Sequence, residues 1–150
     1  MKTDWLIVMD DKCLFCRIVS GEVPATIVYE DDDAIAFLDH RPLFPGHSLL
    51  VPRVHVETLG DLPVKLVAPF FEAAQLLARA VESALDAEGT FVAMNNRVSQ
   101  SVPHLHVHVV PRRRKDGLKG FFWPRTKYKS DEEMEEVKKK IADAVKKIKI

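Results

Sequence analysis

The feature that most constrains this sequence is a stretch at residues 101–111 in which three histidines alternate with small apolar residues. Side chains in a β-strand point alternately to opposite faces, so His104, His106 and His108 are predicted to share one face while the leucine and valines between them enter the core. A neutral imidazole serves near neutral pH as a nucleophile, a proton carrier or a metal ligand. The pattern therefore predicts a strand with one chemical face and one core face.

Composition limits the classes of protein that fit. The chain has 150 residues, 47% of them apolar, and a formal net charge of zero. This length and apolar content predict one globular domain spanning residues 1–150, and the balanced charge disfavours bulk attraction to nucleic acids or membranes. The apolar run at residues 5–9 is too short for a signal peptide core or a membrane span, so a cytoplasmic location is predicted.

Five strands are predicted from runs of apolar and β-branched residues, at residues 27–29, 34–38, 47–53 and 90–94 and in the histidine stretch. One main helix is predicted from an N-cap at Asp61 to about Ala87, with a kink or late start at Pro69. A short helix is expected at residues 13–20, before Gly21. Tight connections between the strands favour a largely antiparallel sheet in an α+β fold.

The inward stripe of the main helix is predicted to contain Leu66, Phe70, Ala73, Ala74, Leu77, Val81 and Leu85. Beyond residue 112 the composition changes to a basic and aromatic loop over residues 113–129. A capping box at Ser130–Glu133 then opens a C-terminal amphipathic helix, with acidic residues early and lysines late, as the helix dipole favours.

Two cysteines, Cys13 and Cys16, have the spacing of a zinc half-site. His55 and one histidine of the triad are available to complete four ligands, which would make a closed, structural site; a plain structural cysteine pair is the alternative. In another alternative, the three triad histidines bind one zinc ion that keeps an open position for water. That arrangement usually needs a nearby carboxylate, and no aspartate or glutamate lies between Thr90 and Asp116.

The triad also suits covalent catalysis at phosphorus. His106 is flanked by the other two histidines, and Gln100 and Ser101 precede the triad with groups that can donate hydrogen bonds to an anion. An imidazole among such donors can attack phosphorus and form a phosphoramidate intermediate. His108 and His47 are then predicted to bind the non-bridging oxygens.

Several motifs together resemble the histidine triad (HIT) family of nucleotide hydrolases and transferases, over roughly residues 12–112. They are CLFC at residues 13–16, FLD at 37–39, PGH at 45–47, VPRVH at 51–55 and QSVPHLHVHVVP at 100–111. The resemblance implies a five-stranded antiparallel sheet with one main helix, a short N-terminal helix and a C-terminal helix. It also implies a homodimer and a purine nucleotide substrate, such as a dinucleoside polyphosphate or an adenosine phosphoramidate, cleaved at the α-phosphate through a nucleotidyl-histidine intermediate.

The resemblance also implies a role for each matched residue. His106 resembles the nucleophile, His108 and Ser101 the residues that hold the α-phosphate and assist the leaving group, and His47 the supporting fourth histidine. Residues expected to bind the nucleotide are Asp39, at the ribose, together with Phe15, Ile18, Phe37, Leu49, Asn95 and Gln100. The zinc-binding bacterial branch implies a structural Zn²⁺ held by Cys13, Cys16, His55 and His104.

The loop at residues 95–100 departs from the family pattern because it is short and lacks the glycines that many members carry there. A hypothesis of another class is a nucleotide-binding regulatory or scaffold protein in which turnover is incidental. The basic tail also suggests RNA binding, but acidic residues offset its charge and no aromatic stacking motif accompanies it, so a nucleic-acid partner is disfavoured.

Overall fold

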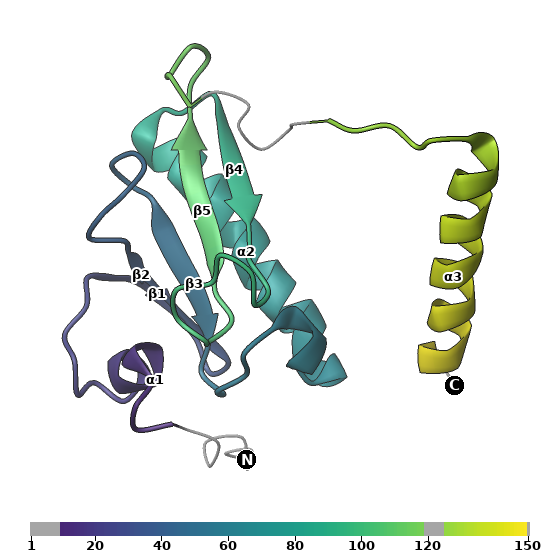
Figure 1. Ribbon diagram of the computed structural model, residues 1–150. Coiled ribbons are helices and arrows are strands. Elements are labelled where there is room, and N and C mark those ends of the chain that lie inside the picture. The colour runs from purple at the N-terminus through teal and green to yellow at the C-terminus, as the bar shows by residue number, and fades with distance from the viewer. Residues whose placement is uncertain (1–9, 119–124, 150) are drawn as a thin grey trace. The chain divides into compact units, whose positions relative to one another are not determined.

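The structure is a computed structural model that describes residues 10–118 and 125–149. The chain divides into two compact units, one up to Asp116 and one from Gly117. The first unit has an α+β fold, as predicted (Figure 1). Its elements are α1 (Leu14–Val19), β1 (Ile27–Glu30), β2 (Ala34–Leu38), β3 (Ser48–Pro52), the 3₁₀ turn η2 (Leu59–Asp61), α2 (Val64–Leu85), β4 (Gly89–Ala93) and β5 (Val107–Arg112). No helix in the described ranges is long and apolar enough to cross a membrane.

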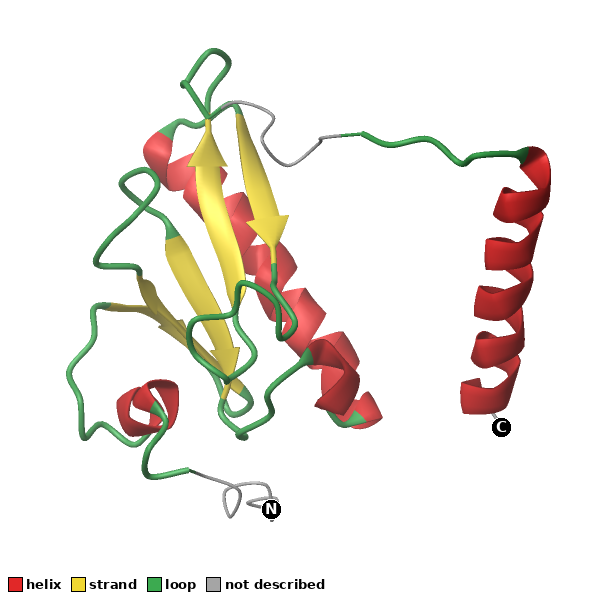
Figure 2. Ribbon diagram, in the orientation of Figure 1, coloured by secondary structure: helices red, strands yellow, loops and turns green. Residues whose placement is uncertain are grey.

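The five strands form one antiparallel sheet in the order β1-β2-β3-β5-β4, which leaves β1 and β4 at the edges (Figure 2). Register assigns the faces, because residues paired across antiparallel strands point to the same side. Ala36, Leu50 and Val107 are aligned across β2, β3 and β5, and Phe37, Leu49 and His108 form the next aligned row. The two rows face opposite sides of the sheet.

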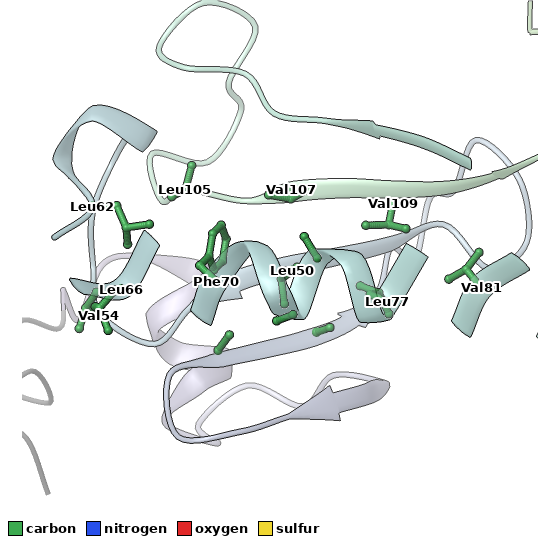
Figure 3. Close-up of a cluster of buried hydrophobic side chains, with 14 residues drawn as sticks. Leu50, Val54, Leu62, Leu66, Phe70, Leu77, Val81, Leu105, Val107 and Val109 are labelled. Atoms are coloured by element: carbon green, nitrogen blue, oxygen red, sulfur yellow. The ribbon is translucent and has the colours of Figure 1, made fainter. Parts of the chain in front are cut away.

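The first row packs against α2 in the main core (Figure 3). Six of the seven residues predicted for the inward stripe of α2 are buried, whereas Leu85, in the last turn, is 39% exposed. The predicted N-cap at Asp61 is wrong: its carboxylate accepts hydrogen bonds from the backbone N–H and hydroxyl of Thr58 and closes η2. The helix begins at Val64 after Pro63, and it continues through Pro69.

The histidine stretch is only partly a strand. β5 begins at Val107, so His104 and His106 precede it. The reason is that the backbone N–H of Leu105 donates to the carbonyl of Val56, 2.7 Å away, so this part of the stretch is bonded to the loop after β3. Side chains still alternate, because Leu105 and Val107 belong to the main core while the histidines face the other side.

The short helix α1 lies in a second apolar cluster, with Ile35 and Val51 from the same sheet face as Phe37 and Leu49. It ends at Val19, with Ser20 as its C-cap and Gly21 following at φ 81°, close to the end that the sequence predicted.

In the second unit, α3 (Asp131–Lys149) begins at the predicted cap, where the Ser130 hydroxyl accepts the backbone N–H of Glu133. Its first turn is acidic and its last turn basic, as predicted. The aromatic part of the preceding loop, residues 119–124, lies outside the described residues.

Candidate functional site

Four sulfur and nitrogen donors meet where α1 approaches the loop after β3. The ligand atoms of Cys13, Cys16, His55 and His104 all lie within 4.8 Å of one another. His104 Nδ1 is 3.4 Å from Cys13 Sγ and 3.6 Å from Cys16 Sγ, and His55 Nδ1 is 3.2 Å from Cys16 Sγ. Edges of a tetrahedron around zinc with sulfur and nitrogen ligands are about 3.4 to 3.8 Å long, so these separations fit a Zn²⁺ ion.

The protonation states of this cluster also suit a metal. His104 Nε2 is 2.8 Å from the carbonyl oxygen of Pro52, which can only accept, so Nε2 carries the proton and Nδ1 presents a lone pair to the thiols. Burial lowers the pKa of His104 to about 4, which keeps the ring neutral, as a ligand must be. Burial raises the pKa of Cys16 to about 11, so this thiol needs a nearby cation to become the thiolate that binds zinc.

His106 is buried next to this cluster and has one defined tautomer. Its Nδ1 lies 2.7 Å from the carbonyl oxygen of His104. Because a carbonyl has no proton to give, Nδ1–H donates, and in the neutral ring the lone pair is on Nε2. An edge contact with Phe15, at 5.1 Å between ring centroids, holds the same ring. The neutral form of His106 therefore presents the Nε2 lone pair on a ring that two neighbours hold.

His108 and His47 form a hydrogen-bonded pair. The backbone N–H of Leu43 donates to His47 Nδ1 at 3.1 Å, so neutral His47 carries its proton on Nε2. That nitrogen lies 3.0 Å from His108 Nδ1 and donates to it, which leaves His108 with Nε2–H as a free donor. Burial lowers the pKa of both rings, that of His108 to about 4 with further contributions from His106 and His47, so both stay neutral at pH 7.

Asp39 lies beside this pair. Its Oδ2 is 3.8 Å from His47 Nε2, and its Oδ1 accepts the backbone N–H of Arg41 at 2.9 Å. Within the described residues, the candidate metal groups are the cysteine and histidine cluster and the group of Asp39, His47 and His108. The three triad rings do not form such a group, so the geometry does not favour the alternative in which they share one zinc ion.

The four apolar residues expected near the base, Phe15, Ile18, Phe37 and Leu49, belong to one cluster. Phe15 and Ile18 come from α1, whereas Phe37 and Leu49 are paired across β2 and β3. Leu49 is also paired with His108, which puts this cluster and the triad on the same sheet face.

The residues expected to bind phosphate either make hydrogen bonds to nearby backbone groups or are exposed. Gln100 Nε2 donates to the carbonyl of Glu57 at 2.7 Å, its Oε1 accepts the backbone N–H of Arg97, and Asn95 Nδ2 donates to the carbonyl of Ser99. Ser101 is exposed. Among the described residues, no hydrogen bond joins Asn95, Gln100 or Ser101 to the histidines.

The sequence did not reveal two features that shape the site. Arg97 and Ser99 adopt left-handed conformations, at φ 70° and 59°, in the loop that lacks glycine. The absence of glycine was visible in the sequence, but the positions that take this conformation were not. The backbone groups of Pro52, His104 and Leu43, which set the histidine tautomers, leave no signal in residue type.

Comparisons with known proteins identify the family. The HIT domain model matches residues 20–115. A relative from Arabidopsis thaliana, named an adenylylsulfatase, is 35% identical over 73% of this chain and 57% of its own length. A relative from Saccharomyces cerevisiae, named an adenosine 5'-monophosphoramidase, is 33% identical over 73% of this chain and 69% of its own length.

Two solved structures are similar. A HIT family protein from Bacillus subtilis has a TM-score of 0.81 and 33% identity, with 89% of this chain and 96% of that chain covered. A Zn-bound histidine triad family protein from Mycobacterium smegmatis has a TM-score of 0.68 and 41% identity, with 76% of this chain and 84% of that chain covered. With the family model matching well over half of the sequence, the chain belongs to the HIT domain family.

Proposed function

We propose that this protein is a nucleotide hydrolase or transferase that cleaves purine nucleotide conjugates at the α-phosphate through a nucleotidyl-His106 intermediate. The observation that carries the proposal is the hydrogen bond from His106 Nδ1–H to the His104 carbonyl, because it leaves the Nε2 lone pair free to attack. The names of the two enzyme relatives support an adenylyl conjugate as substrate.

In the first step, His106 Nε2 forms a bond to the α-phosphorus, and the bond to the leaving group breaks with its electron pair. A phosphate or sulfate leaves as an anion, whereas an amine takes up a proton from solvent as it leaves. The ring becomes a cationic phosphoramidate whose Nδ1–H still donates to the His104 carbonyl. His108 stays neutral and donates Nε2–H to a non-bridging oxygen, while His47 holds it in that tautomer. Ser101 and Gln100 complete the phosphate contacts and assist the leaving group. This role requires the hydrogen bonds of Gln100 to Arg97 and to Glu57 to rearrange when substrate binds.

In the second step, water attacks phosphorus and the N–P electron pair returns to Nε2. The water proton leaves to solvent and the nucleotide is released. Asp39 accepts hydrogen bonds from the ribose, Asn95 supports the phosphate loop, and the purine packs on Phe15, Ile18, Phe37 and Leu49.

Zn²⁺ at Cys13, Cys16, His55 and His104 is proposed as a structural ion. When bound, it supplies four strong bonds that tether the N-terminal segment to the sheet. The donor separations and the lone pair on His104 Nδ1 support this assignment, and so does the Zn-bound relative.

Two further proposals concern assembly and location. A homodimer is supported by the sheet edge at β4 and by exposed apolar side chains on α2 and β4, among them Phe71, Leu76 and Val92. Size-exclusion chromatography with light scattering tests it. A cytoplasmic site of action rests on the cysteine usage expected in a reducing compartment.

The catalytic proposal is tested with adenosine phosphoramidate, adenylyl sulfate and a dinucleoside tetraphosphate, by comparing kcat/KM for the wild type and for His106→Asn. The wild type should form an acid-labile adenylyl adduct, detected by mass spectrometry in a rapid quench. His106→Asn should lose the adduct and about three orders of magnitude in rate. His40→Asn, which removes an exposed histidine, is the matched control. Unchanged adenylate release by His106→Asn, with AMP binding retained, would favour the binding-protein hypothesis.

A further inference from the structure

His104 connects the metal cluster to the proposed nucleophile through a single residue. Its Nδ1 faces the two thiols, its Nε2–H donates to Pro52, and its own carbonyl accepts Nδ1–H of His106. His104 is 0% exposed and His106 is 4% exposed, so no solvent relaxes these contacts. Any displacement of the His104 peptide changes the hydrogen bond that fixes the reactive tautomer.

Phe15 makes a second connection. It lies in α1 between Cys13 and Cys16, and its ring has edge contacts with His104 at 5.9 Å and His106 at 5.1 Å between centroids. An edge contact with Phe37, at 5.5 Å, holds it from the sheet side. Such aromatic contacts contribute direction as well as apolar burial, so the position of Phe15 limits the rotation of the His106 ring.

The position of α1 in turn depends on the cysteine ligands. Across the described part of the chain, the hydrogen-bond contacts that join residues 13–20 to the strands and the loops between them run through the thiols of Cys13 and Cys16 to His55 and His104. The other hydrogen bonds of this segment stay within residues 10–23. A six-residue helix has little stability of its own. The ligand set therefore acts together with the packing of the second apolar cluster to place Phe15.

We propose that Phe15 is a positioning residue: its ring edge and the His104 carbonyl together hold the His106 ring in the orientation that the chemical step needs. The four ligands, when they hold a metal, would tether the helix that carries Phe15. This inference rests on the proposed function of His106. It differs from a role of Phe15 in base binding alone, which would affect KM.

The test uses zinc-loaded full-length protein with Phe15→Leu and Phe15→Met, which remove the ring edge and leave all four ligands in place. Val19→Ala is the control, because Val19 packs on the same cluster from α1. Zinc content is measured by metal analysis, and kcat, KM and the single-turnover rate of adduct formation are measured with adenosine phosphoramidate. The His106 tautomer is measured by ¹⁵N NMR of the imidazole without nucleotide.

Both Phe15 variants should keep one zinc per chain and lose about tenfold in kcat and in adduct formation, with a smaller change in KM. Their two His106 ¹⁵N shifts should move toward each other as the second tautomer becomes populated, while Val19→Ala stays like the wild type. Wild-type kcat and wild-type ¹⁵N shifts in both Phe15 variants would overturn the inference. Absence of an adduct in the wild type would instead overturn the proposed function, and the NMR result still decides whether Phe15 positions the ring.

Discussion

The neutral state of His108 predicts how stability depends on pH. Burial, with His106 and His47 nearby, lowers the pKa of His108 from 6.5 to about 4. The unfolded chain therefore binds a proton at this residue at higher pH than the folded protein does. The resulting contribution to folding is fully present above the unfolded pKa of 6.5, and it is lost as the pH falls from 6.5 through 4.

The size of the effect follows from the same two pKa values. The free energy of unfolding should fall by about 2 kcal/mol between pH 7 and pH 5 through His108 alone, and by about 3 kcal/mol at pH 4. Carboxylates and the other histidines also titrate in this range, so the measurement needs a difference between two proteins. In His108→Asn this part of the pH dependence should disappear.

Urea denaturation of zinc-loaded wild type and His108→Asn at pH 7, 6 and 5 measures the difference, with His40→Asn as control for the loss of a histidine. The difference in free energy of unfolding, wild type minus His108→Asn, should fall by about 2 kcal/mol between pH 7 and pH 5. Equal pH slopes for the two proteins would refute the lowered pKa of His108 in the folded protein.

Three further outcomes are expected. Removing zinc with a chelator, or replacing Cys13 by serine, should lower the midpoint of thermal unfolding substantially, since a structural zinc ion contributes on the order of 10 kcal/mol to folding. Calorimetry with and without added Zn²⁺ measures the midpoint, and an unchanged value would contradict the proposed zinc site. Asp39→Asn should raise KM for a ribonucleotide substrate about tenfold and leave kcat nearly unchanged, with no effect on the dideoxy analogue; equal effects on both would argue against contact with the ribose. Leu50→Ala, at a fully buried position of the main core, should lower the free energy of unfolding by about 2 to 5 kcal/mol, as measured by chemical denaturation. The kinetic constants of the folded variant at 25 °C should equal those of the wild type. A smaller loss of stability would mean that the core collapses around the cavity.

Periodicity in the sequence was sufficient for most of the fold. The strand at Ala34–Leu38 and the buried positions of α2 from Leu66 to Val81 follow directly from the spacing of apolar residues. The predicted start of α2 was wrong because Asp61 accepts hydrogen bonds from Thr58 in η2. Residue type alone does not show which turn an aspartate closes. The predicted start of β5 was wrong because the backbone N–H of Leu105 donates to the carbonyl of Val56. That hydrogen bond depends on the path of a loop distant in the sequence.

For the metal cluster, the resemblance to the HIT family implied which residues come together but not which atoms face one another. The four cysteine and histidine donors meet as predicted, although 39 residues separate Cys16 from His55 and 88 separate Cys16 from His104. The loop at residues 95–100 was harder to predict, because residue type does not show that Arg97 and Ser99 adopt left-handed conformations or that Gln100 bonds to Glu57.

The different roles proposed for these histidines follow from backbone groups. A carbonyl at one ring nitrogen fixes the proton there, at His104 Nε2 and His106 Nδ1, whereas the amide of Leu43 fixes a lone pair at His47 Nδ1. Each choice determines what the opposite nitrogen can do: bind metal, attack phosphorus or donate to His108. Because the carbonyl of His104 makes one of these choices and its ring is a proposed metal ligand, the proposed metal site and the proposed nucleophile are linked through one residue. A substitution that preserves every histidine can therefore still abolish activity if it rotates the peptide of His104.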